Sequence, residues 1–162
     1  MNRPGPSGDG GGDELVAVHI LGLPLDVLRR ARQHQDSLER EFRLIGLAQP
    51  EDRTHVTARL LRLVGDLSEQ FAATGREWRE QIEAAQARGE RTIDLVAWVP
   101  PAAAAASRRL AALLEEADDF CRRGDLLTVA TPPESVDLRR WYLGEFVAQI
   151  GGAAPTPWSE RD

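Results

Sequence analysis

Lysine is absent from this chain of 162 residues, and asparagine occurs once, at Asn2. Without lysine, the chain cannot provide the lysine of a phosphate-binding P-loop, of a protein kinase ATP site, or of a Schiff base with pyridoxal phosphate. Without an asparagine in the body of the sequence, it also lacks the residue that binds magnesium in protein kinases. These two absences exclude the common lysine-dependent nucleotide and pyridoxal phosphate enzymes.

Cysteine is nearly as scarce, because Cys121 is the only one and cannot form an internal disulfide. No apolar run approaches the roughly 20 residues that a membrane-spanning helix needs. No charged segment followed by an apolar one marks a secretory signal. We therefore predict a reduced, soluble, cytoplasmic protein that has no membrane partner.

Short catalytic and metal-binding motifs are missing as well, since neither G-x-S-x-G nor H-E-x-x-H occurs. The three histidines, His19, His34 and His55, are scattered, whereas metal ligands converge, commonly at helical spacing. A hairpin could bring His34 and His55 together, but surface or hydrogen-bonded histidines are the simpler interpretation. We predict no metal, no cofactor and no enzymatic activity.

The residues that are present suffice for one hydrophobic core, because 42% of the chain is hydrophobic and its length suits a single domain. We predict a disordered tail over residues 1–13, one globular domain over 14–152, and a flexible C-terminal tail over 153–162, on which Trp158 could dock. The net charge of -6 argues against a nucleic-acid partner, whose phosphates attract basic surfaces.

Two amphipathic segments are the longest organised feature of the sequence. In residues 28–45 and again in residues 50–89, apolar side chains recur mostly three and four positions apart. A proline-containing turn at residues 46–50 would join them as an antiparallel helical hairpin, with a possible break at Gly75. The two apolar stripes comprise Leu28, Ala31, Leu38, Phe42 and Ile45, then Leu60, Val64, Leu67, Phe71, Trp78, Ile82 and Ala85.

Short β-branched runs indicate a small sheet. Leu15–Leu21 and Thr92–Val99 are predicted strands, and Leu126–Ala130 is a candidate third strand. One helix is predicted after Pro100-Pro101, and another after Thr131-Pro132-Pro133-Glu134, where the threonine hydroxyl would cap the helix. The predicted fold is helix-rich α/β: a small sheet of two or three strands, a long antiparallel helical hairpin and two further helices.

The helix after Pro100-Pro101 carries an acidic pair, Asp118 and Asp119, four residues before Arg122 and Arg123. This spacing predicts ion pairs along a solvated helix face. Cys121 lies in the apolar stripe of the same helix, so we predict buried packing and no nucleophilic role.

The last helix carries the strongest candidate for a binding surface, in residues 137–146. Arginine and aromatic residues dominate the energetics of protein interfaces, because they bury a large area and keep a polar group. We predict a partner-binding surface formed by Arg139, Arg140 and Tyr142, together with Glu145, a carboxylate in an apolar stretch. The alternative interpretation is that the aromatic residues only dock this helix on the core.

Two long stretches, ATPPESVDLRRWYLGEFVAQIGG followed by PTPW, and HILGLPLDVLRRARQHQDSLEREFRLI, resemble a group of actinobacterial proteins without an assigned activity. The resemblance covers most of residues 15–158. Members of this group are often encoded beside partner-switching components, namely STAS-class antagonists, serine phosphatases and ATP-binding anti-sigma kinases. The resemblance implies a place in sigma-factor control, although this chain lacks the asparagine of such kinases and the strand-helix repeat of STAS domains.

The sequence thus predicts a non-catalytic regulatory protein that acts in signalling by protein-protein interaction, accessory to sigma-factor partner switching. The first alternative is a small-molecule-binding sensor or a small enzyme, with a pocket between hairpin and sheet near His19, Trp98 and Arg140. The second alternative is a homo-oligomer that associates through the hairpin, if its apolar stripes are too wide for one chain to bury.

Overall fold

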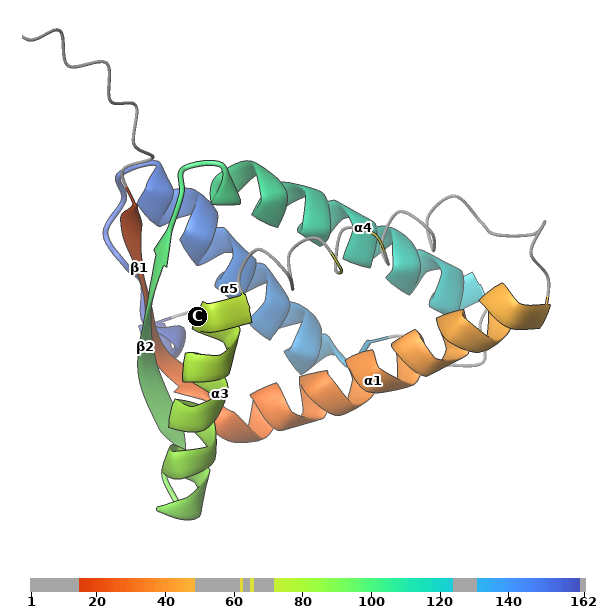
Figure 1. Ribbon diagram of the computed structural model, residues 1–162, viewed down its shortest axis with the longest axis horizontal. Helices are drawn as coiled ribbons and strands as arrows, with labels where there is room; N and C mark the ends of the chain where they lie inside the picture. Colours follow the sequence, from red (N-terminus) through yellow and green to blue (C-terminus); the bar gives the residue numbers. More distant parts are fainter. Residues whose placement is uncertain (1–14, 49–61, 63–64, 66–71, 124–130, 161–162) are drawn as a thin grey trace, which may run out of the picture.

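The structure is a computed structural model, and the residues that it describes are 15–48, 62, 65, 72–123 and 131–160 (Figure 1). Three sequence predictions fall outside these residues: the tail over 1–13, the third strand over 126–130, and most of the hairpin's second limb over 50–71.

The described elements form a helix-rich α/β fold with one two-stranded sheet, as the sequence predicts. In the view of Figure 1, the two strands stand at one edge of the molecule and the long helices extend away from them. In chain order the elements are β1 (Val16–Pro24), α1 (Leu25–Ala48), α3 (Ala72–Ala87), β2 (Thr92–Val99), α4 (Ala103–Arg123), α5 (Pro133–Ile150) and the 3-10 helix η1 (Trp158–Glu160).

Strands β1 and β2 pair antiparallel, with His19 opposite Val96 and Ile20 opposite Leu95. Successive side chains of a strand point to opposite faces, so alternation of apolar residues buries one face. The inner face is fully covered by the helices, and the other face carries exposed side chains. The residues of the inner face are Val18, Ile20, Leu95, Ala97 and Val99.

Strand β1 continues three residues beyond its predicted end at Leu21, because a bulge accommodates Gly22. The register shifts between Ile20 and Leu23, and Gly22 has φ 69°, which is accessible to glycine at little cost. Its backbone N–H donates to Oδ1 of Asp94 on β2 at 2.6 Å. The bulge is therefore fixed by a side chain 72 positions away in sequence.

Helix α1 follows β1 directly and ends at Ala48, so the predicted turn does not begin at Gly46. A glycine inside a helix, such as Gly46, destabilises the helix by about 1 kcal/mol relative to alanine. The next two residues, Leu47 and Ala48, are good helix formers, so α1 continues through Gly46. Among the described elements, α1 contacts α5 and β1. Its pairing with residues 50–71 lies outside the described part of the chain.

Helix α3 is continuous through Gly75, so the break that the sequence left open at this position does not occur. It ends where predicted, before Gly89, which has φ 73°. The N–H of Gly89 donates to Gln86 O and that of Glu90 to Ala85 O, the pair of bonds that closes a helix around a left-handed glycine. Helix α3 packs on β2.

Within the predicted C-terminal tail over residues 153–162, Trp158 docks on the body, as the sequence allowed. Trp158 packs edge-on against Trp141, with ring centroids 5.3 Å apart. The indole N–H of Trp141 donates to Thr156 O at 2.8 Å, and the N–H of Thr156 donates to a carboxylate oxygen of Glu145 at 3.0 Å. The segment thus covers the end of α5 and reaches β1 through η1.

One hydrophobic core joins the inner face of the sheet to the four helices of the described residues. Helix α4 contributes Ala103, at its N-terminal end. Within the described residues, no helix is long and apolar enough to cross a membrane. The core consists of Val18, Ile20, Leu23, Leu25, Val27, Trp78, Ile82, Ala85, Leu95, Ala97, Val99, Ala103, Leu138, Trp141 and Phe146.

Candidate functional site

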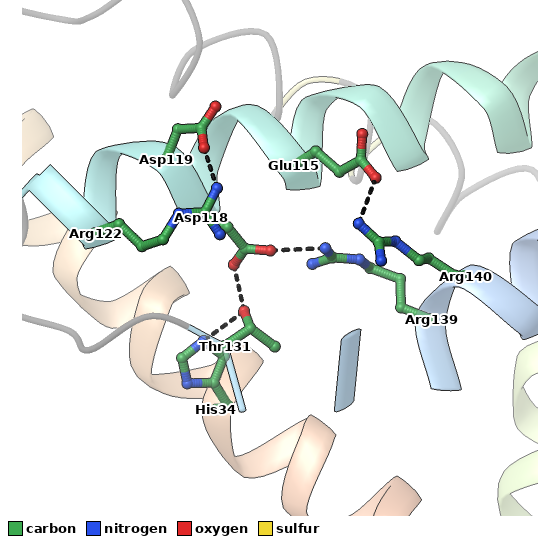
Figure 2. A network of polar contacts seen from close by, with 8 residues as sticks. All are labelled: His34, Glu115, Asp118, Asp119, Arg122, Thr131, Arg139 and Arg140. Carbon is green, nitrogen blue, oxygen red and sulfur yellow. Dashed lines mark hydrogen bonds and ion pairs between the residues drawn. The ribbon is translucent and has the colours of Figure 1, made fainter. Parts of the chain in front are cut away.

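The four predicted site residues do not share one surface. Arg140 is exposed and lies 3.4 Å from Glu115 of α4. Arg139 has a side chain only 15% exposed and is bound inside the molecule (Figure 2). Tyr142 is half-buried and Glu145 is buried. The side chains of Arg139, Tyr142 and Glu145 contact α4, α3 and the C-terminal segment, respectively, so Arg140 is the one exposed member of the predicted set.

Arg139 belongs to a polar network that joins α1, α4 and α5 (Figure 2). Its guanidinium donates to Oδ2 of Asp118 at 2.6 Å, and the other carboxylate oxygen of Asp118 accepts from the hydroxyl of Thr131. The Thr131 hydroxyl also lies 3.0 Å from Nε2 of His34. Asp118 is 5% exposed at its side chain, so its charge is stabilised by Arg139 and Thr131 rather than by water.

The direction of these hydrogen bonds limits the chemistry of the network. A threonine hydroxyl has one proton, and a carboxylate can only accept, so Thr131 donates to Asp118 and accepts from His34. Nε2 of His34 therefore carries a proton and cannot take one from Thr131. This is the reverse of the arrangement that activates a serine or threonine nucleophile.

Burial lowers the pKa of His34 below its usual value; Asp118 counteracts the effect, and Arg139 adds to it. Neutral His34 is thus favoured near neutral pH, in agreement with one protonated ring nitrogen. Burial, with Asp118 and Glu41, also raises the pKa of the Cys121 thiol, which packs in α4 as predicted. A raised pKa keeps the thiol protonated and unreactive.

Sequence reasoning missed this network because it assigned two of its members to local roles. The Thr131 hydroxyl does not cap α5; the cap residue is Pro132, without a side-chain hydrogen bond. Asp118 pairs with Arg139 of α5 and not with Arg122, which binds Asp119. The spacing of Asp118 on the buried stripe of α4, one turn before Cys121, was the available signal.

Glu145 and Gln149 complete a second buried network at the edge of the sheet. The side-chain amide of Gln149 accepts from the His19 N–H at 2.8 Å and donates to the His19 C=O at 2.7 Å, as a neighbouring strand would. The same amide nitrogen lies 2.7 Å from Glu145, which also holds Thr156. On the other edge, the indole N–H of Trp78 donates to Val96 O at 3.0 Å.

A cavity of about 680 Å³ lies between the inner sheet face and the helices α1, α3, α4 and α5. Its walls are mostly apolar, and Tyr142, His34, Thr131 and Arg139 all line it. The alternative interpretation of the sequence placed a pocket near His19, Trp98 and Arg140, and none of these three residues is in the described lining of this cavity. Volumes of this size are typical of small-molecule sites.

The outer face of the sheet presents a second candidate site, which we call the outer sheet patch: Leu15, Ala17, Val96 and Trp98. Trp98 is 63% exposed, and Leu15 and Val96 are the other large apolar side chains exposed in the described residues. Ala17 lies opposite Trp98 in the ladder. His19, opposite Val96, borders the patch, and its side chain is exposed.

In the ranges that the structure describes, no group of histidine, cysteine or acidic side chains is arranged to hold a metal ion. The chain matches no protein-family model, no curated protein and no solved structure in the comparisons made with each. The roles of the network, the cavity and the outer sheet patch therefore rest on their geometry.

Proposed function

We propose that this is a non-catalytic regulatory protein that binds a partner protein through the outer sheet patch. The observation that carries the proposal is Trp98, whose side chain is 63% exposed on the outer face of the sheet. The other three tryptophans pack on the core or on one another. An exposed tryptophan next to further apolar side chains is a feature of protein interfaces, where tryptophan is enriched among the dominant residues.

The backbone around Trp98 is rigid, which favours binding. Its neighbours Ala97 and Val99 are fully buried, and β2 is paired with β1 on one edge. Trp98 is therefore presented in a fixed direction, and little conformational entropy is lost when a partner covers it. Side chains already occupy the edge hydrogen-bonding groups of His19 and the Val96 C=O, which disfavours strand addition at these positions and favours binding to the face of the sheet.

The regulatory setting that we propose is sigma-factor partner switching in the cytoplasm, and it rests on the resemblance of the two terminal stretches to actinobacterial proteins encoded beside such components. The reversed hydrogen bonds of the Thr131 network support a binding role over catalysis. The partner would be a protein of that system, with no nucleic acid and no membrane involved. Self-association is the alternative partner choice, now through the outer sheet patch or through the hairpin.

Photo-crosslinking tests the surface directly. A photoreactive phenylalanine analogue is placed at position 98 in the tagged protein and, as a control, at position 108, an exposed site on α4. We expect a crosslinked partner, or a dimer of the 17.9 kDa chain, from position 98 only. Equal products from both positions would indicate non-specific contact and would contradict the proposal.

The identified partner is then titrated by calorimetry against Trp98→Ser and Arg140→Ala. We expect Trp98→Ser to lose about 2 kcal/mol or more of binding free energy, as for a central interface tryptophan. Arg140→Ala should change it little, because Arg140 lies on α5 and pairs with Glu115. If only Arg140→Ala weakens binding, the interaction surface is the last helix, as the sequence first suggested.

A further inference from the structure

The cavity has a lining whose charge is opposite in sign to that of the molecule. Four arginines line it, Arg32, Arg76, Arg79 and Arg139, and its described lining contains no aspartate or glutamate. The chain as a whole has a net charge of -6. In a protein with excess acid, a cavity whose described charged lining residues are all arginines favours an anion.

Three of these arginines are available to a ligand. Arg139 is taken by Asp118, but in the described part of the chain no carboxylate pairs with Arg32, Arg76 or Arg79. All three are exposed, so they mark the solvent side of the cavity. The deeper walls are apolar, and their residues include Leu28, Ile82, Ala97, Leu110, Leu138 and Phe146.

Tyr142 also lines the cavity. Its ring is held by Trp78 and Phe146, with centroids at 6.2 and 5.2 Å. Among the described residues, its hydroxyl has no hydrogen-bond partner. Burial raises the pKa of Tyr142 to about 12, and Arg32 is close enough to oppose this rise. The phenol is therefore a protonated hydrogen-bond donor at neutral pH, in a cavity that Arg32 also lines.

We propose that this cavity binds an amphipathic carboxylate, an acid that carries an apolar chain. The carboxylate would accept a hydrogen bond from the Tyr142 hydroxyl and pair with Arg32, and Arg76 and Arg79 would add to the positive potential. The apolar chain would lie along the leucine, isoleucine and phenylalanine walls. Such a ligand would accept a hydrogen bond from the phenol and pair with arginines that have no carboxylate partner among the described residues, while it buries apolar surface. This site is separate from the outer sheet patch.

The test is a calorimetric titration of the full chain with dodecanoate, dodecanol and dodecyltrimethylammonium, each kept below its micelle concentration. The three probes share one apolar chain and differ in head group. The variants are Tyr142→Phe, Arg32→Gln and, as a control, Arg29→Gln. Arg29 is exposed on the same helix and is not in the described lining of the cavity. Arg29→Gln therefore removes the same charge as Arg32→Gln but at a position outside that lining. Tyr142→Phe keeps the ring contacts that support folding.

We expect dodecanoate to bind at least about tenfold more tightly than dodecanol, and the cationic probe not to bind, because the recognised group is a carboxylate. Tyr142→Phe and Arg32→Gln should each weaken dodecanoate binding about tenfold, while Arg29→Gln leaves it unchanged. The proposal is overturned if dodecanoate does not bind, if dodecanol binds equally well, or if Arg29→Gln weakens binding as much as Arg32→Gln.

Discussion

At the scale of single residues, Asp118 and Asp119 show how much position decides. They are adjacent and chemically identical, yet a helix turns about 100° per residue, so they face different surroundings. Asp118 is enclosed between Arg139 and Thr131, whereas Asp119 pairs with Arg122 in solvent. A buried charge is tolerated only when it is paired and hydrogen-bonded, and here both conditions are met.

We predict that Asp118→Asn lowers the free energy of unfolding by about 3 kcal/mol. The Arg139 side chain is only 15% exposed, and the substitution removes its counter-charge. The same change one position later, Asp119→Asn, should cost less than about 1 kcal/mol, since both partners of that pair are more than half exposed. Urea unfolding of both variants measures the difference. Equal losses would mean that the network in Figure 2 adds no stability beyond that of a surface ion pair.

At the scale of elements, the two-stranded sheet is completed by side chains. An isolated pair of strands is marginally stable and exposes two edges that can pair with other chains. Gln149 of α5 covers the β1 edge through both backbone groups of His19, and Trp78 of α3 covers the β2 edge at Val96. Glu145 fixes Gln149 in this position. The helices therefore supply hydrogen bonds as well as apolar contact.

We predict that Gln149→Leu lowers the free energy of unfolding by about 3 kcal/mol. The His19 N–H, the His19 C=O and the Glu145 carboxylate would each lose their hydrogen bond to the Gln149 amide. Gln81→Leu, an exposed site on α3, should change stability by no more than about 0.5 kcal/mol. Hydrogen exchange followed by NMR gives the local readout, in which His19 loses amide protection in Gln149→Leu only. Unchanged protection at His19 would show that Gln149 does not act as a neighbouring strand.

The elements could be predicted from sequence where the signal is local, and the site could not. Thr92–Val99 matches its predicted strand residue for residue, because alternation and the following prolines fix both its face and its end. The extension of β1 through Gly22 depends on Asp94, and the role of Thr131 depends on Asp118 and His34. Those partners come from other elements, and a one-dimensional pattern does not reveal their proximity.

At the scale of the whole molecule, three of the four tryptophans pack in or on the core and the fourth is exposed on the outer face of the sheet. Trp78 and Trp141 lie in the core, and Trp158 packs on it from the C-terminal segment. Trp98 alone among the four is exposed, on the face of the sheet away from the helices. The fold and the proposed binding surface therefore involve different tryptophans, which makes the two roles separable by substitution.

We predict that deletion of residues 154–162 lowers the free energy of unfolding by about 3 kcal/mol, whereas Trp98→Ala changes it by no more than about 0.5 kcal/mol. The deletion removes the Trp158 ring that packs on Trp141. It also removes Thr156, the hydrogen-bond partner of the Trp141 indole N–H and of a Glu145 carboxylate oxygen. Trp98→Ala removes a ring that solvent already covers for 63% of its surface. Chemical denaturation of both proteins compares the losses. If the deletion is neutral, the segment only rests on the body; if Trp98→Ala is as costly as the deletion, Trp98 stabilises the fold and the case for it as a binding residue is lost.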